Sequence, residues 1–275
     1  GKSTLFNCLS NAKAQSANFP FCTIEPNIGV VNVPDNRLAR LEELVNPERV
    51  MPATVDIVDI AGLVRGASKG EGLGNQFLAN IRETDAIIHV LRCFDNDNIV
   101  HVDGNINPIR DKETIDIELQ LKDLESLDKK LEKVRKTART GNKEAQKEQE
   151  VLEKVKKGLE AAVSVRAIEL SEKEREEYVT PLQFITDKPV LYVCNVDEKS
   201  AVNGNDYVAK VKEAVKDENA EVIVLAVGTE ADITELDSFE ERQLFLEDLG
   251  LQEAGSSVLI RAAYKLLKQQ TYFTA

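Results

Sequence analysis

The chain opens with Gly1-Lys2-Ser3-Thr4, followed at once by Leu5-Phe6-Asn7, and this stretch is the first indication of the fold. A phosphate-binding loop has the pattern GxxxxGK[ST] and lies between a strand and a helix. The opening residues match the second half of that pattern. We therefore expect a helix to begin here, with the strand and the first loop glycine preceding the given sequence. A solvated lysine beside a serine or threonine N-cap would explain the short string equally well.

Each residue of the opening string has a role in such a loop. Lys2 would place its charge on the β- and γ-phosphates of a nucleotide, and Ser3 would bind Mg²⁺. The backbone amides from Gly1 to Thr4, at the N-terminus of the helix, would hold phosphate oxygens. The string therefore predicts that these four residues bind phosphate.

A second motif ends the apolar, β-branched run Thr54-Val55-Asp56-Ile57-Val58-Asp59. Asp59-Ile60-Ala61-Gly62 matches the DxxG of Mg²⁺-dependent nucleotide hydrolases, in which the aspartate holds Mg²⁺ through water and the glycine amide contacts the γ-phosphate. For an isolated DxxG, an ordinary turn is the simpler explanation. Leu63 stands where Ras-like GTPases have the glutamine that orients the attacking water, so we assign no catalytic residue and expect slow turnover.

Two further elements follow in the order expected of such a protein. Thr23 lies between the first helix and the next strand, where a switch threonine completes the Mg²⁺ shell, although an ordinary loop threonine is the alternative. Asn195-Val196-Asp197-Glu198 comes directly after an apolar strand, where GTPases have NKxD to bind guanine. Val196 replaces the lysine, and Glu198 is one methylene longer than the aspartate that pairs with guanine N–H donors. Both departures put guanine specificity in doubt.

The order of strands and helices predicts an α/β fold. Apolar strand patterns at residues 28–33, 54–59, 86–91, 189–194 and 221–226 alternate with helical patterns at 36–45, 75–83 and around 258–266. The four motifs fall at strand ends, where ligands of α/β sheets bind. Together they favour a P-loop NTPase sheet.

The segment 107–186 differs from the rest of the chain, because it consists of long, highly charged stretches with helical patterns. Apolar residues recur at three- and four-residue intervals in two sets, the first being Leu124, Leu127, Leu131 and Val134, and the second Leu152, Val155, Leu159 and Ala162. Thr140-Gly141-Asn142 interrupts the pattern, which favours an antiparallel helical hairpin. Ser171 and Glu174 form a candidate capping box for a further helix that ends before Pro181. We predict a nucleotide-binding domain of residues 1–106 and 187–275, with residues 107–186 as a helical insert.

Charge offers one sign of a partner. The 275 residues carry a net charge of −13, which opposes binding to nucleic acid, yet residues 129–147 hold eight basic and two acidic side chains. Contact with RNA phosphates is the functional interpretation of this turn, and a solvated helical face is the alternative. The residues proposed for that contact are Lys129, Lys130, Lys133, Lys136 and Arg139.

Other features bound the class of protein. No apolar run reaches the ~18–20 residues of a membrane span, and no secretory signal opens the chain, so we expect a soluble cytoplasmic protein with no membrane partner. The cysteines, Cys8, Cys22, Cys93 and Cys194, are scattered, which favours buried, reduced thiols. We expect His89 and His101 to serve packing rather than metal binding.

Together these motifs resemble the YchF subfamily of Obg-related P-loop NTPases, the Obg-like ATPases. The resemblance rests on residues 1–7, 18–27 (Asn-Phe-Pro-Phe-Cys-Thr-Ile-Glu-Pro-Asn), 59–64 with the glycine-rich run after them, and 195–198, and it extends to residues 270–275. It implies a G domain with a coiled-coil-like insert, ATP preferred over GTP, and association with ribosomes. It also implies a C-terminal TGS domain, which, like the first half of the P-loop, lies outside the given sequence.

The leading hypothesis is therefore a Mg²⁺-dependent switch that hydrolyses ATP at the ribosome. One alternative is a non-hydrolysing, nucleotide-dependent binding module, in which Leu63 reflects lost chemistry. Another is an α/β protein in which the Gly-Lys-Ser-Thr string is accidental.

Overall fold

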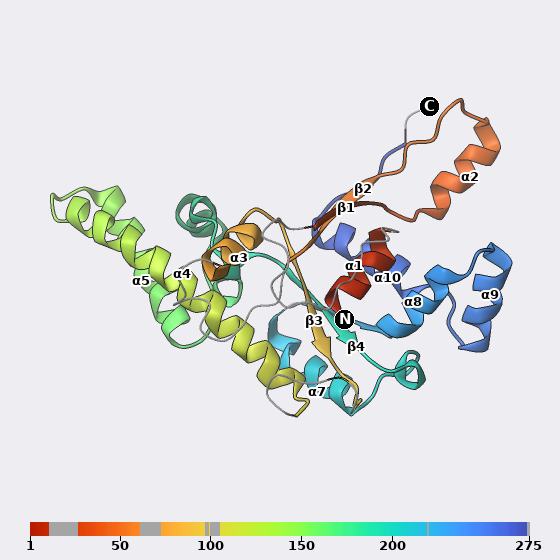
Figure 1. Cartoon of the computed structure of the whole chain (residues 1–275). Coiled ribbons are helices and arrows are strands. Elements are labelled where there is room, and N and C mark those ends of the chain that lie inside the picture. Colours follow the sequence, from red (N-terminus) through yellow and green to blue (C-terminus); the bar gives the residue numbers. More distant parts are fainter. Residues whose placement is uncertain (11–26, 61–72, 97–98, 100–104, 219, 274–275) are drawn as a thin grey trace. The chain divides into compact units, whose positions relative to one another are not determined.

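The structure is a computed structural model that describes residues 1–10, 27–60, 73–96, 99, 105–218 and 220–273 (Figure 1). The chain divides into two compact units. The first contains Gly1–Ile60, Ala86–Ile109 and Val190–Ala275, and the second contains Ala61–Asp85 and Arg110–Pro189. Within the described ranges, the helices are all too short or too polar to cross a membrane.

The first unit begins with helix α1 (Lys2–Ser10) and two antiparallel strands, β1 (Asn27–Asn32) and β2 (Thr54–Asp59), which are paired so that Asn27 lies opposite Asp59. Helix α2 (Asn36–Val45) connects the strands. It begins after Asp35, whose side chain accepts a hydrogen bond from Arg37 N–H, and ends at Asn46 in the left-handed conformation. The predicted strands and helix are confirmed here, within one residue at each end.

The same unit also contains a parallel sheet. Its strands, in the order β3-β4-β5, are β3 (Ile87–Arg92), β4 (Val190–Asn195) and β5 (Glu221–Leu225). All six residues of β4 are buried, as expected for a parallel strand covered on both faces. The apolar pattern over 86–91 suggested a buried strand, but only Leu91 of β3 is buried and the other residues are half-buried. Among the described strands, β3 pairs with β4 alone, so one of its edges has no described strand beside it.

Side chains of β4 alternate between two clusters because successive residues of a strand point to opposite faces. Leu191 and Val193 join one cluster with residues of α1 and of α10 (Gly255–Leu266). Tyr192 and Cys194 join the other, with Val208 and further residues of α7 (Asp206–Ala214). The remaining helices of the unit are α8 (Val227–Glu235) and α9 (Phe239–Asp248). The sequence patterns singled out α1 and α10 but not α7, α8 or α9.

The second unit is helical. It contains α3 (Leu73–Arg82), α5 (Lys143–Glu160) and nearly all of α4 (Pro108–Ala138), and α4 and α5 form the predicted antiparallel hairpin. Its core includes the apolar residues predicted at three- and four-residue spacing, among them Leu127, Leu131, Leu152 and Val155. The assignment of Ala162 to the apolar stripe is wrong. It lies beyond the end of α5, is exposed, and has a φ of 59°.

After the hairpin the chain forms a series of short turns. Ser171 and Glu174 make the predicted capping box, which opens the one-turn helix α6 (Glu172–Glu174). A π-helical turn at Arg175–Val179 and a 3₁₀ turn at Thr180–Leu182 follow, and Pro181 lies at the start of the latter. A last 3₁₀ turn at Ile185–Asp187 leads into β4.

Candidate functional site

The N-terminus of α1 presents the first motif. Lys2 and Ser3 are exposed, Thr4 is half-buried, and the Leu5 N–H donates to the Gly1 carbonyl at 2.9 Å, which closes the first turn. Buried apolar residues on the opposite face anchor the helix, and α1 packs against β1, β2, α8 and α10. The first amides of a helix have no helical acceptor, so this end can receive an anion.

Asp59 lies at the carboxyl end of β2, within electrostatic range of this helix start. The pKa of the Gly1 amino group is lowered, first by burial and then by Lys2, whereas the Asp59 carboxylate raises it. Asp59 is half-buried, and among the described residues neither it nor Lys2 forms an ion pair. The tertiary structure thus brings the Asp59 carboxylate within electrostatic range of the Gly1 amino group, although more than fifty residues separate the two in sequence.

These residues fit a Mg²⁺ ion by their chemistry. The Ser3 hydroxyl and the Asp59 carboxylate are oxygen ligands of the kind that Mg²⁺ prefers. Among the described residues, no cationic side chain forms an ion pair with Asp59. Thr23 and Gly62, the other residues predicted for this part of the site, lie outside the described residues, as do Leu63, Cys22 and His101.

The carboxyl edge of the parallel sheet carries the third described motif. Asn195 ends β4 and is 8% exposed, and its Oδ1 accepts a hydrogen bond from the Val227 N–H at 3.1 Å. The Val196 N–H donates to the Leu225 carbonyl at 3.0 Å. The segment after β4 is therefore joined to the start of α8. Sequence reasoning missed the segment 226–228, although its place directly after the next strand of the sheet was a usable signal.

The three predicted base-binding residues lie in different environments. Asn195 is held by its bond to Val227, and Glu198 is exposed at the start of the 3₁₀ turn Glu198–Ser200, where Asp197 accepts from the Ser200 N–H at 3.0 Å. Val196 is only 3% exposed and packs in the cluster of Leu91 and Tyr192. Its side chain belongs to the core, whereas those of Asn195 and Glu198 reach the edge of the sheet.

A buried carboxylate that the sequence did not single out lies behind α1. Glu230 of α8 is 2% exposed and accepts hydrogen bonds from the Gly255 N–H at 2.7 Å and the Ser256 N–H at 3.0 Å. Burial raises the pKa of the Cys8 thiol on α1 to about 11, and Glu230 is the second cause of that shift. A single glutamate without periodicity carries no sequence signal, so only the fold identifies it.

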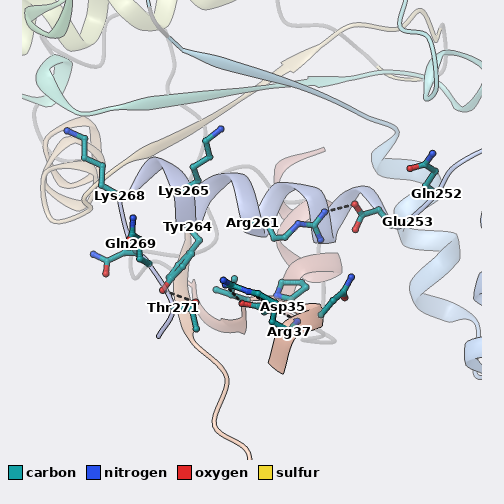
Figure 2. A pocket seen from close by; sticks show the side chains of 14 residues that line it. Asp35, Arg37, Gln252, Glu253, Arg261, Tyr264, Lys265, Lys268, Gln269 and Thr271 are labelled. Atoms are coloured by element: carbon teal, nitrogen blue, oxygen red, sulfur yellow. Dashed lines mark hydrogen bonds and ion pairs between the residues drawn. The ribbon is translucent and has the colours of Figure 1, made fainter. Parts of the chain in front are cut away.

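A cavity of about 1070 Å³ lies at the start of α2 and along α10, and Figure 2 shows the side chains that line it. Its charged side chains are partly paired, because Arg37 binds Asp35 at 2.7 Å and Arg261 binds Glu253. Thr271 donates a hydrogen bond to the Tyr264 hydroxyl at 3.3 Å. The lining contains none of the predicted nucleotide-binding residues. This cavity is therefore distinct from the site at the N-terminus of α1.

The basic turn of the hairpin divides into paired and unpaired side chains. Lys129, Lys130 and Lys136 form ion pairs with Glu125, Glu148 and Glu132, at 2.6, 2.7 and 2.9 Å. Other cations near the turn are exposed and have no ion pair within the described part of the chain: Lys133, Arg139, Lys143 and Lys147. Of the five residues predicted to contact RNA, only Lys133 and Arg139 present an uncompensated charge.

A helix that starts with Lys2 and Ser3 and packs against a strand ending in Asp59 places the chain among the P-loop nucleoside triphosphatases. A family model described as a 50S ribosome-binding GTPase matches residues 1–157. The chain belongs to the YchF family. It is 52% identical over 277 residues to the ribosome-binding ATPase YchF of Bacillus subtilis (strain 168) and 54% identical over 275 residues to that of Escherichia coli O157:H7. All of this chain and 75% of each relative are covered.

A solved structure gives the same result. The YchF GTPase of Schizosaccharomyces pombe matches with a TM-score of 0.81 and 36% identity over 97% of this chain and 72% of that one. The resemblance and the α/β P-loop fold inferred from the sequence are thereby confirmed.

Proposed function

We propose that this protein is a nucleotide-controlled switch that hydrolyses ATP to ADP and phosphate with Mg²⁺, uses GTP less well, and associates with ribosomes in the cytoplasm. The observation that carries the proposal is the N-terminus of α1, with Lys2 and Ser3 exposed and the charge of Asp59 acting on it. The relatives named ribosome-binding ATPase support the choice of nucleotide and of partner.

In this proposal, residues 1–106 and 187–275 form the nucleotide-binding domain, and residues 107–186 form the insert, although α3 packs with the helical unit. Lys2 and the amides from Gly1 to Thr4 bind phosphate, and Gly62 contacts the γ-phosphate. Ser3, Thr23 and Asp59 hold Mg²⁺, which supplies charge to stabilise the phosphates during transfer.

The base is bound at the carboxyl edge of the parallel sheet. Asn195 is fixed by its bond to Val227, and Glu198 offers a carboxylate that is too long for the paired N–H donors of guanine. Val196 contributes shape from the core, since its side chain is buried. We therefore expect ATP to bind at least several-fold more tightly than GTP in calorimetry on the full chain.

Glu198→Asp tests this assignment without disturbing the core, because Glu198 is exposed. Relief of one polar mismatch is worth roughly 1 kcal/mol, so the ratio of ATP to GTP affinity should fall by about fivefold. Equal or reversed affinities in the unmodified protein would overturn the ATP preference. An unchanged ratio in Glu198→Asp would show that the base is bound elsewhere.

The metal site is tested by Ser3→Ala and Asp59→Ala. Each change removes an oxygen ligand, so Mg²⁺-dependent ATP hydrolysis should fall by roughly tenfold or more. Asp56→Ala is the matched control, because Asp56 is an exposed carboxylate on the same strand. Turnover unchanged from the unmodified protein would remove the altered residue from the site.

The replacement of the usual glutamine by Leu63 keeps one alternative, a binding module that does not hydrolyse nucleotide. Steady release of phosphate over many turnovers supports the switch ATPase. Tight ATP binding without turnover supports the module.

A further inference from the structure

The C-terminal end of α3 is held by a lysine from the far end of the helical unit. Lys188 Nζ donates to the Arg82 carbonyl at 3.0 Å and also to the Thr84 carbonyl. The last carbonyls of a helix have no helical donor, and a cation is favourable there. Lys188 therefore binds two acceptors at the end of α3, more than a hundred residues away in sequence.

The backbone just before Lys188 is hydrogen-bonded to α4. Asp123 of α4 is fully buried, and its carboxylate accepts hydrogen bonds from the Ile185 N–H at 2.8 Å and from the Thr186 N–H and hydroxyl at 2.7 Å each. Asp187 is bound by Arg175. Lys188 therefore extends from a segment whose position is set by α4.

A second contact joins the same two helices. Arg82, the last residue of α3, donates through its guanidinium to the Ser126 hydroxyl on α4 at 3.4 Å. Leu78 and Ile81 of α3 are buried as well. The end of α3 is thus joined to α4 both directly and through Lys188.

The contacts differ in how readily they can open. A cavity of about 690 Å³ is lined by Arg82, Thr84 and Lys188, so water can replace the bonds of the lysine. The Asp123 bonds are buried, and an unpaired carboxylate there would be costly. The hydrogen bonds of Lys188 to the end of α3 can therefore be removed without exposing a buried, unpaired charge.

We propose that Lys188 is a positioning residue that makes α3 and the helical hairpin move as one body, so that a displacement of α3 on nucleotide exchange also displaces the hairpin. The inference rests on the proposed function. Along the chain, α3 is the first described helix after Asp59, and it lies in the same compact unit as the hairpin. Nucleotide-dependent displacement of α3 would therefore displace α4 and α5.

The test is hydrogen exchange of the full chain, followed by mass spectrometry, with Mg²⁺ and either ADP or a slowly hydrolysed ATP analogue. In the unmodified protein we expect α3 and α4 peptides to exchange at rates that differ at least threefold between the two nucleotides. Lys188→Met keeps the length of the stem but removes the donors. It should retain the protection that bound nucleotide gives to residues 1–10, and should lose at least half of the difference between the two nucleotides in α4.

Two controls separate positioning from simple capping. Lys188→Arg should restore the difference in α4, because a guanidinium can still donate to both carbonyls. Lys173→Met, a change at an exposed lysine of the same unit, should behave like the unmodified protein. If Lys188→Met does not fold, Lys188→Gln replaces it, since it removes the charge and shortens the side chain while its amide keeps N–H donors.

The outcomes are distinct. A Lys188→Met protein that keeps the full nucleotide-dependent difference in α4 overturns the inference and leaves the proposed function standing. So does an unmodified protein in which α3 responds and α4 does not. If neither nucleotide changes exchange in residues 1–10, the proposed function fails, and this inference fails with it.

Discussion

At the scale of single residues, Glu230 shows how a buried charge is stabilised in this fold. Its carboxylate accepts from the first two amides of α10, where the positive end of the helix favours an anion. Ala254, the residue at the N-cap, offers no side-chain acceptor. Gly255 is required because a Cβ there would lie 2.0 Å from Leu225 Cδ1 and 3.0 Å from Glu230 Oε1.

We expect Glu230→Ala to lower the free energy of unfolding by roughly 2–4 kcal/mol, because two partly buried amides lose a buried, charged acceptor. Glu230→Gln keeps an acceptor oxygen and should recover part of that loss. Glu235→Ala, at the exposed end of the same helix, is the control and should stay within about 0.5 kcal/mol. Urea denaturation followed by circular dichroism measures all three, and equal effects of the two alanine substitutions would disprove the capping role.

At the scale of elements, the hairpin is joined to the short turns that follow it by a bond outside its apolar core. The Tyr178 hydroxyl donates to Glu144 Oε1 at 2.9 Å, which joins the π-helical turn to the first turn of α5. This bond to a carboxylate raises the pKa of Tyr178 to about 12. The phenol must be protonated to donate, so the contribution of the bond to stability is complete below the usual pKa of about 10 and is lost as the pH rises towards 12.

The measurement is a titration of ¹³C-labelled tyrosine by nuclear magnetic resonance. At pH values about 1 unit above the usual pKa of a tyrosine, we expect Tyr178 to remain largely protonated in the native protein. Glu144→Gln should lower its pKa, because the charged acceptor is the principal cause of the shift. A Tyr178 that ionises with the same midpoint in both proteins would exclude the bond.

At the scale of the whole molecule, charge is unevenly distributed. The chain has a net charge of −13, yet the hairpin turn carries cations that no described carboxylate neutralises. Three lysines of the same hairpin form ion pairs with glutamates. The hairpin therefore offers two sets of three cationic side chains, one with ion pairs and one without them among the described residues. One set is Lys133, Arg139 and Lys147, and the other is Lys129, Lys130 and Lys136.

Sedimentation with ribosomes at several salt concentrations tests the proposed RNA contact. Replacing Lys133, Arg139 and Lys147 by Gln should lower the slope of log affinity against log salt by about two to three, since each phosphate contact contributes roughly 0.7–0.9. Replacing the paired set by Gln should change the slope by less than about one. ATP affinity should stay unchanged in both proteins. If the protein with Gln at all three unpaired positions co-sediments like the unmodified protein at every salt concentration, the hairpin turn does not contact RNA.

The sequence alone predicted the motifs and most of the elements, because these depend on local chemistry. Periodicity predicted the strands and the hairpin, since the repeats of strand and helix are encoded residue by residue. Motif order alone named Lys2, Ser3 and Asp59 as a candidate phosphate and metal site, and their roles stay predictions. Thr23 and Gly62 stay predictions, because they lie outside the described residues.

The tertiary structure alone shows which polar groups that are distant in sequence form hydrogen bonds. The bonds of Asn195 to Val227, Glu230 to the start of α10, and Lys188 to the end of α3 each join segments at least twenty-five residues apart. The same holds for the modest burial of β3, which depends on which strands lie beside it, and for Val196, whose place in the core no motif shows. A single Asn, Glu or Lys has no period and fits a solvated surface equally well, so its role depends on the packing of the other elements around it.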